Sequence, residues 1–384
     1  MNRIQSIDVT RSLVMVVMAL DHVRDLLHTP AMTQDPTDLA TTTPALFLTR
    51  WITHLCAPTF VFLSGTSAYL SLQKRNGKTT RWFLLKRGLV LILLELTVIN
   101  FAFWFDIQFR TILLQVIFAI GGGLVLLSVI SKLPVWWVAI LGVIIVAGHG
   151  LLPPAPFTDP VARFGWSLLF GVNLFAVSPA LTVVVSYPLI PWLGIMLLGY
   201  ALGPVFYQDS ETRQKVLWYL GGIFLALFAM LRLQNSYGDP KRWAVQTDTV
   251  FTMLSLLNVS KYPPSLLYTL LMLGLALLVL AAAERSRNAL TQWLIVYGKV
   301  PMFYYILHWY AVHLLMLAMV FLQGYTGADI PSGPLNFGRP SGAGISLGGV
   351  YLVWAGLVLA LYPLCRWYGR YKAAHPEIGW LRYV

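Results

Sequence analysis

Long apolar stretches alternate with shorter polar connections along the whole chain. A helix needs about 20 consecutive apolar residues to cross a bilayer, and ten stretches come close to that length. They lie near residues 7–28, 45–73, 82–105, 111–131, 134–152, 185–206, 215–233, 263–283, 299–322 and 347–366. A short amphipathic segment, 291–298, leads into the ninth. The pattern predicts an all-α polytopic membrane protein, with residues 1–384 forming a single bundle of about ten transmembrane helices.

The composition agrees with a membrane location. Hydrophobic residues make up 58% of the chain and charged residues only 11%, whereas soluble domains carry about 25% charged residues. The net charge of +12 would suggest nucleic-acid binding in a soluble protein. Here the basic residues lie mostly between apolar stretches, where lysine and arginine set topology. We therefore expect the lipid bilayer, and no nucleic acid, as a partner.

The basic residues also predict the orientation of the chain. A cytoplasmic N-terminus places most of them on cytoplasmic connections, and the inverted arrangement violates the positive-inside rule. Both termini are therefore predicted to be cytoplasmic. The first stretch contains Asp8 and Arg11 and lacks a small-residue cleavage site, so we interpret it as a retained span. The long connections fall on the opposite side, at 29–44, 153–184, 234–262 and 323–346.

Ionisable residues form a stripe along the first predicted helix. At 100° per residue, Arg11 and His22 lie about 20° apart, Asp8 about 40° from His22, and Asp25 about 60° away on the other side. Asp21 and His28 share a neighbouring stripe. A charge at the bilayer centre costs about 2.5–3.5 kcal/mol even on a lenient scale, so such residues usually face the bundle interior. The stripe therefore predicts a polar interior surface.

The second stretch adds Arg50 and His54, which share one helix face at i,i+4 spacing. Because helices joined by a short connection are usually neighbours, we expect these two side chains to meet the polar end of the first helix. That end carries Asp21, His22, Arg24, Asp25 and His28. A histidine beside carboxylates suits proton transfer or nucleophilic attack. The alternative is an ion-pair network that only anchors the helix ends.

Several sequence blocks resemble the transmembrane acyltransferase superfamily. Asp8-x-x-Arg11 followed by His22 resembles its opening, and Phe60 with Ser64-Gly65 resembles its Phe-x-x-x-Ser-Gly element. The closer resemblance is to the bacterial branch related to heparan-alpha-glucosaminide N-acetyltransferase, over residues 3–320. It rests on Leu20-Asp21-His22-Val23-Arg24-Asp25, Ala57-Pro58-Thr59-Phe60, Tyr187 to Gly194, and Lys261-Tyr262-Pro263-Pro264-Ser265.

This resemblance implies an enzyme that takes an acetyl or similar acyl group from cytoplasmic acyl-CoA and delivers it to a sugar-type acceptor on the periplasmic side. It gives His22 the catalytic role, as base or nucleophile. The eukaryotic relative has an amide at the position of His22 and a histidine in the following loop, for which His28 is the nearest counterpart here. The choice between these histidines stays open. The superfamily's Arg-x-Arg element is also incomplete, because Lys86-Arg87-Gly88-Leu89 lacks the second arginine.

Roles for the other polar residues follow from the chemistry that acyl transfer needs. Asp21, Arg50 and His54 are expected to support His22 or the charge that develops on the thioester oxygen. Phosphates of acetyl-CoA are expected to bind basic side chains, and an aromatic helix face to stack on the nucleotide. The candidates for the acetyl-CoA site are Arg11, Arg81, Lys86, Arg87 and His308, and those for the acceptor site are Arg24, Asp25, Lys261 and Tyr262.

No metal site is predicted. The two cysteines do not form a C-x-x-C pair, and His308 and His313 lie about 140° apart on their helix. The oligomeric state is not encoded in a recognisable pattern, and a homo-oligomer stays possible.

A proton-coupled transporter is the competing interpretation, with Asp21, His22 and Glu95 as a proton relay. Transporters often contain inverted repeats, and no repeat is evident here. Glu95 could alternatively pair with Arg11 or line a channel. A scaffold for envelope assembly would leave the charges of the first helix unexplained.

Overall fold

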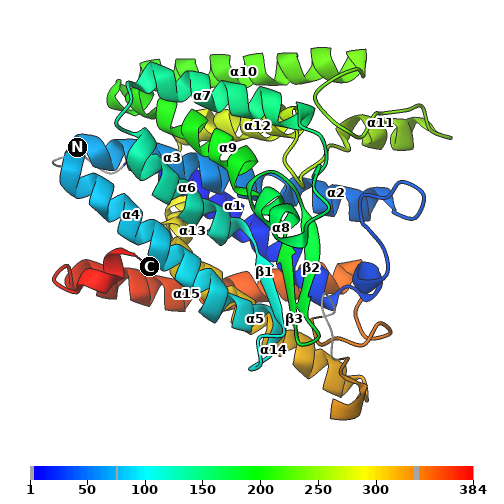
Figure 1. Ribbon diagram of the computed structural model, residues 1–384. Coiled ribbons are helices and arrows are strands. Elements are labelled where there is room, and N and C mark those ends of the chain that lie inside the picture. Colours follow the sequence, from blue (N-terminus) through cyan, green and yellow to red (C-terminus); the bar gives the residue numbers. More distant parts are fainter. Residues whose placement is uncertain (1–3, 75–76, 332–336, 384) are drawn as a thin grey trace.

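The computed structural model describes residues 4–74, 77–331 and 337–383. Most of them are helical (Figure 1). The longer helices are α1 (Gln5–Leu27), α2 (Pro44–Thr53), α3 (Cys56–Lys74), α4 (Gly77–Leu94), α6 (Val116–Ile130), α7 (Val135–Gly148), α9 (Leu189–Ala201), α10 (Ser210–Gln234), α12 (Leu266–Ala283), α13 (Ala289–Lys299), α14 (Pro301–Leu322) and α15 (Leu347–Ala374). Shorter elements are α5 (Asn100–Trp104), α8 (Pro160–Leu169), α11 (Thr249–Leu257), β1 (Thr111–Leu114), β2 (Asn173–Ser178) and β3 (Leu181–Val185).

The predicted fold class, an all-α polytopic membrane protein, is confirmed. Every predicted span contains a helix, and the predicted lead-in segment is α13. Six helical stretches within the described residues are long and apolar enough to cross a membrane. Two others, α6 with Val116–Ile130 and α7 with its extension to Leu151, are shorter, and α1 and α4 carry several charges. The predicted number of ten spans is therefore not confirmed.

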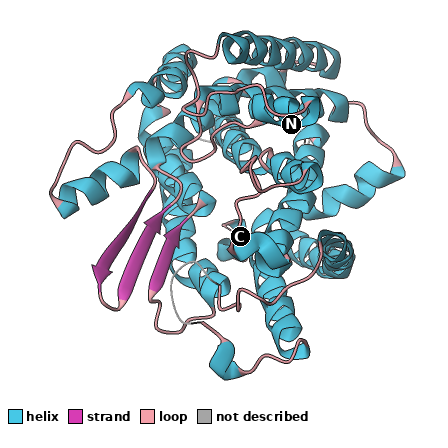
Figure 2. Cartoon of the chain, turned by 90° about the vertical axis from the view of Figure 1, so that its right-hand side faces the viewer, coloured by secondary structure: helices cyan, strands magenta, loops and turns pink. Residues whose placement is uncertain are grey.

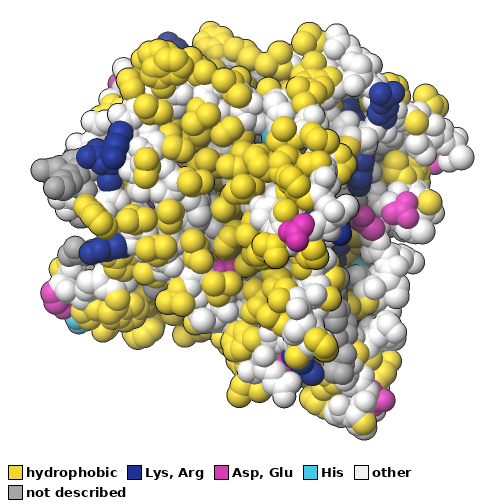
Figure 3. All heavy atoms as spheres, in the orientation of Figure 1, with side chains coloured by type: hydrophobic (Ala, Val, Ile, Leu, Met, Phe, Trp, Pro, Cys, Tyr) yellow, Lys and Arg dark blue, Asp and Glu magenta, His cyan; other side chains and the backbone are white. Residues whose placement is uncertain are grey.

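The outer surface suits a bilayer. Hydrophobic side chains cover most of the face in Figure 3, and the lysines and arginines lie toward its edges. Only 17% of the apolar window of α10 and 22% of that of α15 is buried in the protein, so both helices offer apolar surface to lipid. The two termini lie on the same side of the bundle in Figure 1. We call that side the proximal face and the opposite side the distal face; the assignment of the proximal face to the cytoplasm stays a prediction.

Helix α1 occupies the centre of the bundle. It contacts α2, α3, α12, α13, α14 and α15. Its ionisable side chains Asp8, Asp21 and Arg24 are buried, as the stripe predicts. Because α1 is covered by protein on most sides, these charges are solvated by other side chains and cavities and not exposed to hydrocarbon.

Close packing of α3 on α9 explains one of the sequence blocks. A Cβ atom added at Gly65 would lie 1.9 Å from the main-chain oxygen of Met196, and one at Gly199 would lie 2.0 Å from that of Phe62. The hydroxyl of Thr66 donates to the Gly199 carbonyl oxygen at 2.8 Å. Glycine lets two backbones approach to this distance, so Gly65 and Gly199 allow α3 and α9 to pack with their main chains in contact.

The predicted span 45–73 is interrupted. Helix α2 ends at Thr53, and α3 begins at Cys56. Pro58 has no N–H group with which to bond the carbonyl of His54. That carbonyl instead accepts a hydrogen bond from the Tyr268 hydroxyl at 2.8 Å. The break therefore links the α2–α3 corner to α12.

The sequence prediction missed a small sheet. Strand β1 pairs in parallel with β3, and β2 pairs antiparallel with β3. Figure 2 shows the sheet to one side of the helices. The predicted helices 111–131 and 185–206 were therefore wrong at their first residues, which belong to β1 and β3. The connection 153–184, predicted as a loop, contains α8 and β2 as well.

Candidate active site

The ring of His22 lies between α1 and α14. Its Nδ1 is 2.6 Å from Nε2 of His308, and its centroid is 4.0 Å from the Trp309 ring, with the two planes 27° apart. Tyr305 approaches edge-on, with ring centroids 6.4 Å apart. Nδ1 of the buried His308 is in turn 3.0 Å from the main-chain oxygen of Tyr304. Residues of one face of α14 therefore hold the His22 ring in place.

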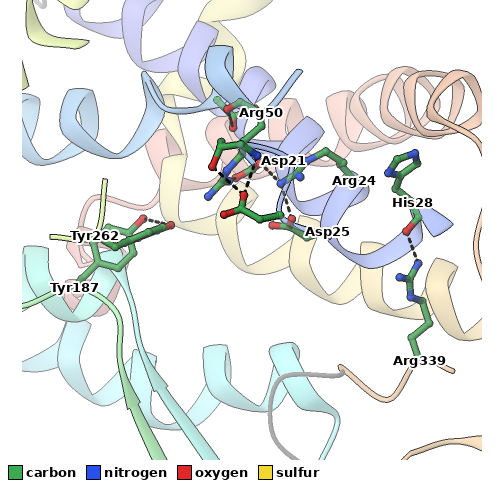
Figure 4. Close-up of polar contacts among 11 residues, drawn as sticks. Asp21, Arg24, Asp25, His28, Arg50, Tyr187, Tyr262 and Arg339 are labelled. Atoms are coloured by element: carbon green, nitrogen blue, oxygen red, sulfur yellow. Dashed lines mark hydrogen bonds and ion pairs between the residues drawn. The ribbon is translucent and has the colours of Figure 1, made fainter. Parts of the chain in front are cut away.

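A buried ion cluster lies beside His22. Asp21 Oδ1 accepts a hydrogen bond from Arg24 Nη2 at 2.9 Å, and Asp21 Oδ2 accepts one from Arg50. The same Arg24 nitrogen is 2.5 Å from Asp25 Oδ1. Figure 4 shows the four side chains converging from α1 and α2. The structure thus brings together Asp21, Arg24, Asp25 and Arg50, and their opposite charges compensate one another inside the protein.

His22 and Asp21 line a small cavity, which we call the histidine cavity. Its volume is about 30 Å³, enough for a water molecule or two. Lys261, Tyr187 and Gln115, from other parts of the chain, also line it. The ring of His22 is only partly buried, which is consistent with access to this space. An imidazole beside a small polar cavity can exchange protons with a molecule that enters it.

A second cavity lies toward the proximal face, and we call it the arginine cavity. Its volume is about 200 Å³, and Arg11 of α1 and Arg87 of α4 line it together with Ser64, Ser67 and Ser71 of α3. Ser71 lies near the proximal end of α3. Phe60, Val116 and Tyr305 line both this cavity and the histidine cavity. The two spaces therefore meet at these three side chains.

The predicted acetyl-CoA residues separate into two groups. Arg11 and Arg87 line the arginine cavity. Arg11 Nη2 donates to the Ser67 hydroxyl at 3.2 Å, whereas Nε of Arg87 has no hydrogen-bond partner within the described part of the chain. Lys86 is exposed, and neither it nor Arg81 lines the cavity. The serines of α3 were missed, although their i, i+3, i+7 spacing in the sequence marks a polar helix face.

The predicted acceptor residues Lys261 and Tyr262 lie at the distal side of the histidine cavity. The Lys261 side chain lines the cavity, and its Nζ lies 5.0 Å from the centroid of the Tyr262 ring. The Tyr262 hydroxyl is 3.5 Å from that of Tyr187 (Figure 4). Lys261 and Tyr187 therefore border the cavity beside His22, and Tyr262 contacts both of them.

Comparison with known protein families adds a decisive observation. Residues 3–232 match the family described as heparan-alpha-glucosaminide N-acetyltransferase, catalytic, which is more than half of the 384 residues. The chain belongs to this family. Membership implies acetyltransferase activity, and the long apolar helices make the protein a membrane acetyltransferase. A comparison with curated proteins finds no match.

The segment that matches the heparan-alpha-glucosaminide N-acetyltransferase family contributes only part of the site. That segment contains His22, the ion cluster, Arg87 and Tyr187. Lys261, Tyr305 and His308 lie beyond its end at residue 232. Helix α14 and the connection before α12 therefore complete the site from outside the matched segment.

The other two candidate histidines, His28 and His54, lie away from the histidine cavity. The main-chain oxygen of His28 accepts a hydrogen bond from Arg339 at 2.8 Å, and Figure 4 shows its ring pointing away from Asp21 and Arg50. The buried ring of His54 packs against Tyr268, with centroids 5.8 Å apart. Neither side chain lines the cavity. The structure therefore brings His22, and not His28 or His54, to this space.

Glu95 lies in a π-helical turn, Glu95–Ile99, between α4 and α5. One carboxylate oxygen accepts a hydrogen bond from the main-chain nitrogen of Gln115 at 2.6 Å. The other has no hydrogen-bond partner among the residues described, so Glu95 is not paired with Arg11. Since Gln115 lines the histidine cavity, Glu95 supports its wall through the start of α6.

Proposed function

We propose that the protein transfers an acetyl group from acetyl-CoA, bound from the proximal face, to a sugar-type acceptor that approaches from the distal face. The observation that carries this proposal is the meeting of the arginine and histidine cavities at Phe60, Val116 and Tyr305. The arginine cavity offers guanidinium groups that can bind the phosphates of the donor. The histidine cavity offers an imidazole beside which the thioester can react. With the proximal face in the cytoplasm, the protein would belong to the cell inner membrane.

Donor binding would use the arginine cavity. Guanidinium groups bind phosphates in a planar, bidentate geometry, and Nε of Arg87 has no hydrogen-bond partner among the described residues. The apolar lining, with Phe83 and Leu91 among its members, suits the pantetheine chain. The thioester would then lie past Tyr305, where the histidine cavity begins.

Transfer would occur in the histidine cavity. In the direct route, His22 accepts a proton from the acceptor's amine or hydroxyl as that group attacks the thioester carbonyl. The carbon–sulfur bond breaks, and the CoA thiolate receives the proton from His22. In the two-step route, the lone pair of His22 attacks the thioester carbonyl, the carbon–sulfur bond breaks and the CoA thiolate leaves, which gives an acetyl-imidazole. The acceptor then attacks the acetyl carbon, the carbon–nitrogen bond to His22 breaks, and the proton lost by the acceptor neutralises the CoA thiolate. The ammonium group of Lys261 would stabilise the negative charge on the thioester oxygen in either route.

An assay in which the donor and the acceptor lie on opposite sides of a membrane tests the proposal. The purified full chain is reconstituted in proteoliposomes with amino sugars trapped inside and labelled acetyl-CoA added outside. We expect acetylated sugar to accumulate in the lumen, through molecules whose proximal face is outward. Absence of acetyl-CoA turnover with every acceptor, or product formed only when both substrates share one side, would contradict the proposal.

Arg87 gives a prediction about donor binding. We expect Arg87→Ala to raise KM for acetyl-CoA by about 10-fold to 100-fold, because a lost hydrogen bond between charged groups costs about 1.5–3 kcal/mol, and about 1.4 kcal/mol is tenfold in affinity. The neighbouring exposed Lys86 is the matched control, and Lys86→Ala should change KM less than about twofold, since exposed ion pairs contribute little. Steady-state kinetics in nanodiscs measures both variants. Equal effects of the two substitutions would remove Arg87 from the donor site.

A further inference from the structure

We infer that His308 is a positioning residue that holds His22 in the tautomer with a proton on Nδ1 and a free lone pair on Nε2. The inference rests on the proposed function for its catalytic consequence, but its structural content does not. It concerns a chain of three groups, from the Tyr304 carbonyl through His308 to His22. Sequence reasoning assigned His308 to the acetyl-CoA site, whereas the structure puts its ring against His22, with centroids 4.9 Å apart.

The direction of each hydrogen bond follows from the group at the end of the chain. A main-chain carbonyl oxygen only accepts, so His308 Nδ1, 3.0 Å from Tyr304 O, must carry a proton. Complete burial of the His308 ring disfavours a charged imidazolium, and in the neutral imidazole the other nitrogen is then an acceptor. His308 Nε2 is 2.6 Å from His22 Nδ1, so His22 Nδ1 must be the donor. Neutral His22 is thereby left with an unprotonated Nε2.

The surroundings of His308 favour this single arrangement. Its side chain is fully buried at 0% exposure, so water cannot offer an alternative partner. Tyr304 lies one helical turn before it on α14, and their rings stack with planes 13° apart. Neither the Tyr304 carbonyl nor the His308 ring can turn away without disturbing α14. The helix therefore determines which nitrogen of His22 carries the proton.

The consequence is a base with one defined site for the proton. As the acceptor attacks the thioester, its proton goes to His22 Nε2, while Nδ1 keeps its proton and its bond to His308. The proton on Nε2 then goes to the departing CoA thiolate, which restores the starting tautomer. If the proton of His22 were on Nε2, that nitrogen would present an N–H group to the acceptor and could not take up a proton. In catalytic triads a carboxylate likewise holds the histidine in the tautomer that can act as a base.

Nuclear magnetic resonance tests the tautomer directly. The full chain is labelled with ¹⁵N-histidine in nanodiscs, and the signal of His22 is identified by its loss in His22→Ala. We expect wild-type His22 to show a protonated Nδ1 and an unprotonated Nε2 near neutral pH, and His308→Phe to produce a mixture with proton on Nε2. Wild-type His22 protonated on Nε2, or an unchanged signal in His308→Phe, would overturn the inference. This readout needs no turnover, so it stands apart from the fate of the proposed function.

Kinetics tests the consequence. We expect His308→Phe to lower kcat about 100-fold, within the range of general-base catalysis, with KM for acetyl-CoA changed less than about twofold. His308→Gln, whose side-chain oxygen can accept from His22 Nδ1, should retain activity within about tenfold of wild type. The matched control is His313→Phe on the same helix, since the His313 ring contacts Phe105 at 4.0 Å and not His22. Equal losses in His308→Gln and His308→Phe, or equal losses in His308→Phe and His313→Phe, would indicate a packing role and contradict the inference.

Discussion

His22→Ala is expected to lower the rate of acetyl transfer about 1,000-fold, because a positioned general base contributes about 10² to 10⁴ in rate. His28→Ala should leave the rate within about threefold of wild type. His22 lies in α1 and His28 directly follows its last residue, yet only His22 lines the histidine cavity. Release of CoA, measured with the purified chain at saturating acetyl-CoA, compares the two variants.

The pattern of kinetic constants distinguishes chemistry from binding. Loss of a base that acts in the transition state lowers kcat and kcat/KM together and leaves KM nearly unchanged. Added imidazole should restore part of the rate in His22→Ala, because the substitution enlarges a cavity that already holds about 30 Å³. Transfer by His22→Ala at the wild-type rate, together with a large loss in His28→Ala, would assign the chemistry to the loop histidine and refute the role given to His22.

Local periodicity was sufficient to predict the helices and the polar centre. The positions of apolar residues predict a helix in every span, and the 100° rotation per residue aligns the ionisable groups of α1. The i,i+4 spacing of Arg50 and His54 also predicts a shared face. However, α2 ends at Thr53, and only Arg50 joins the ion cluster. The ring of His54, just past the end of the helix, packs against Tyr268 instead.

Contacts between distant segments could not be predicted in the same way. His22 and His308 are 286 positions apart, and no helical period relates them. The pairing of Thr111–Leu114 with Leu181–Val185 is likewise long-range, and short apolar runs of this kind are read equally well as helix or strand. The sequence could therefore identify which residues are polar and buried, whereas the pairings among them depend on how α14 and the sheet pack on the bundle.

Asp21 is expected to show the largest effect on stability. Asp21→Leu removes the acceptor shared by Arg24 and Arg50 and leaves two buried guanidinium groups with less compensation. Removing one partner of a buried ion pair costs about 3–5 kcal/mol, which is a large fraction of the 5–15 kcal/mol that stabilises a typical folded domain. We therefore expect a marked fall in the thermal unfolding midpoint of the variant in detergent, with activity lost even at temperatures where it stays folded.

The matched comparison is an ion pair at the surface. Asp106 pairs with Arg110 at 2.9 Å and accepts hydrogen bonds from the main-chain nitrogens of Gln108 and Arg110. The Arg110 side chain is 48% exposed, so water replaces the ion pair when it is broken. Asp106→Leu should therefore shift the unfolding midpoint far less than Asp21→Leu. The intermediate substitution Asp21→Asn keeps one acceptor oxygen without the charge, and its effect should fall between the two. If Asp21→Leu unfolds at the same temperature as Asp106→Leu, the cluster at the centre of the bundle is not a buried charge network, because water must then reach both arginines.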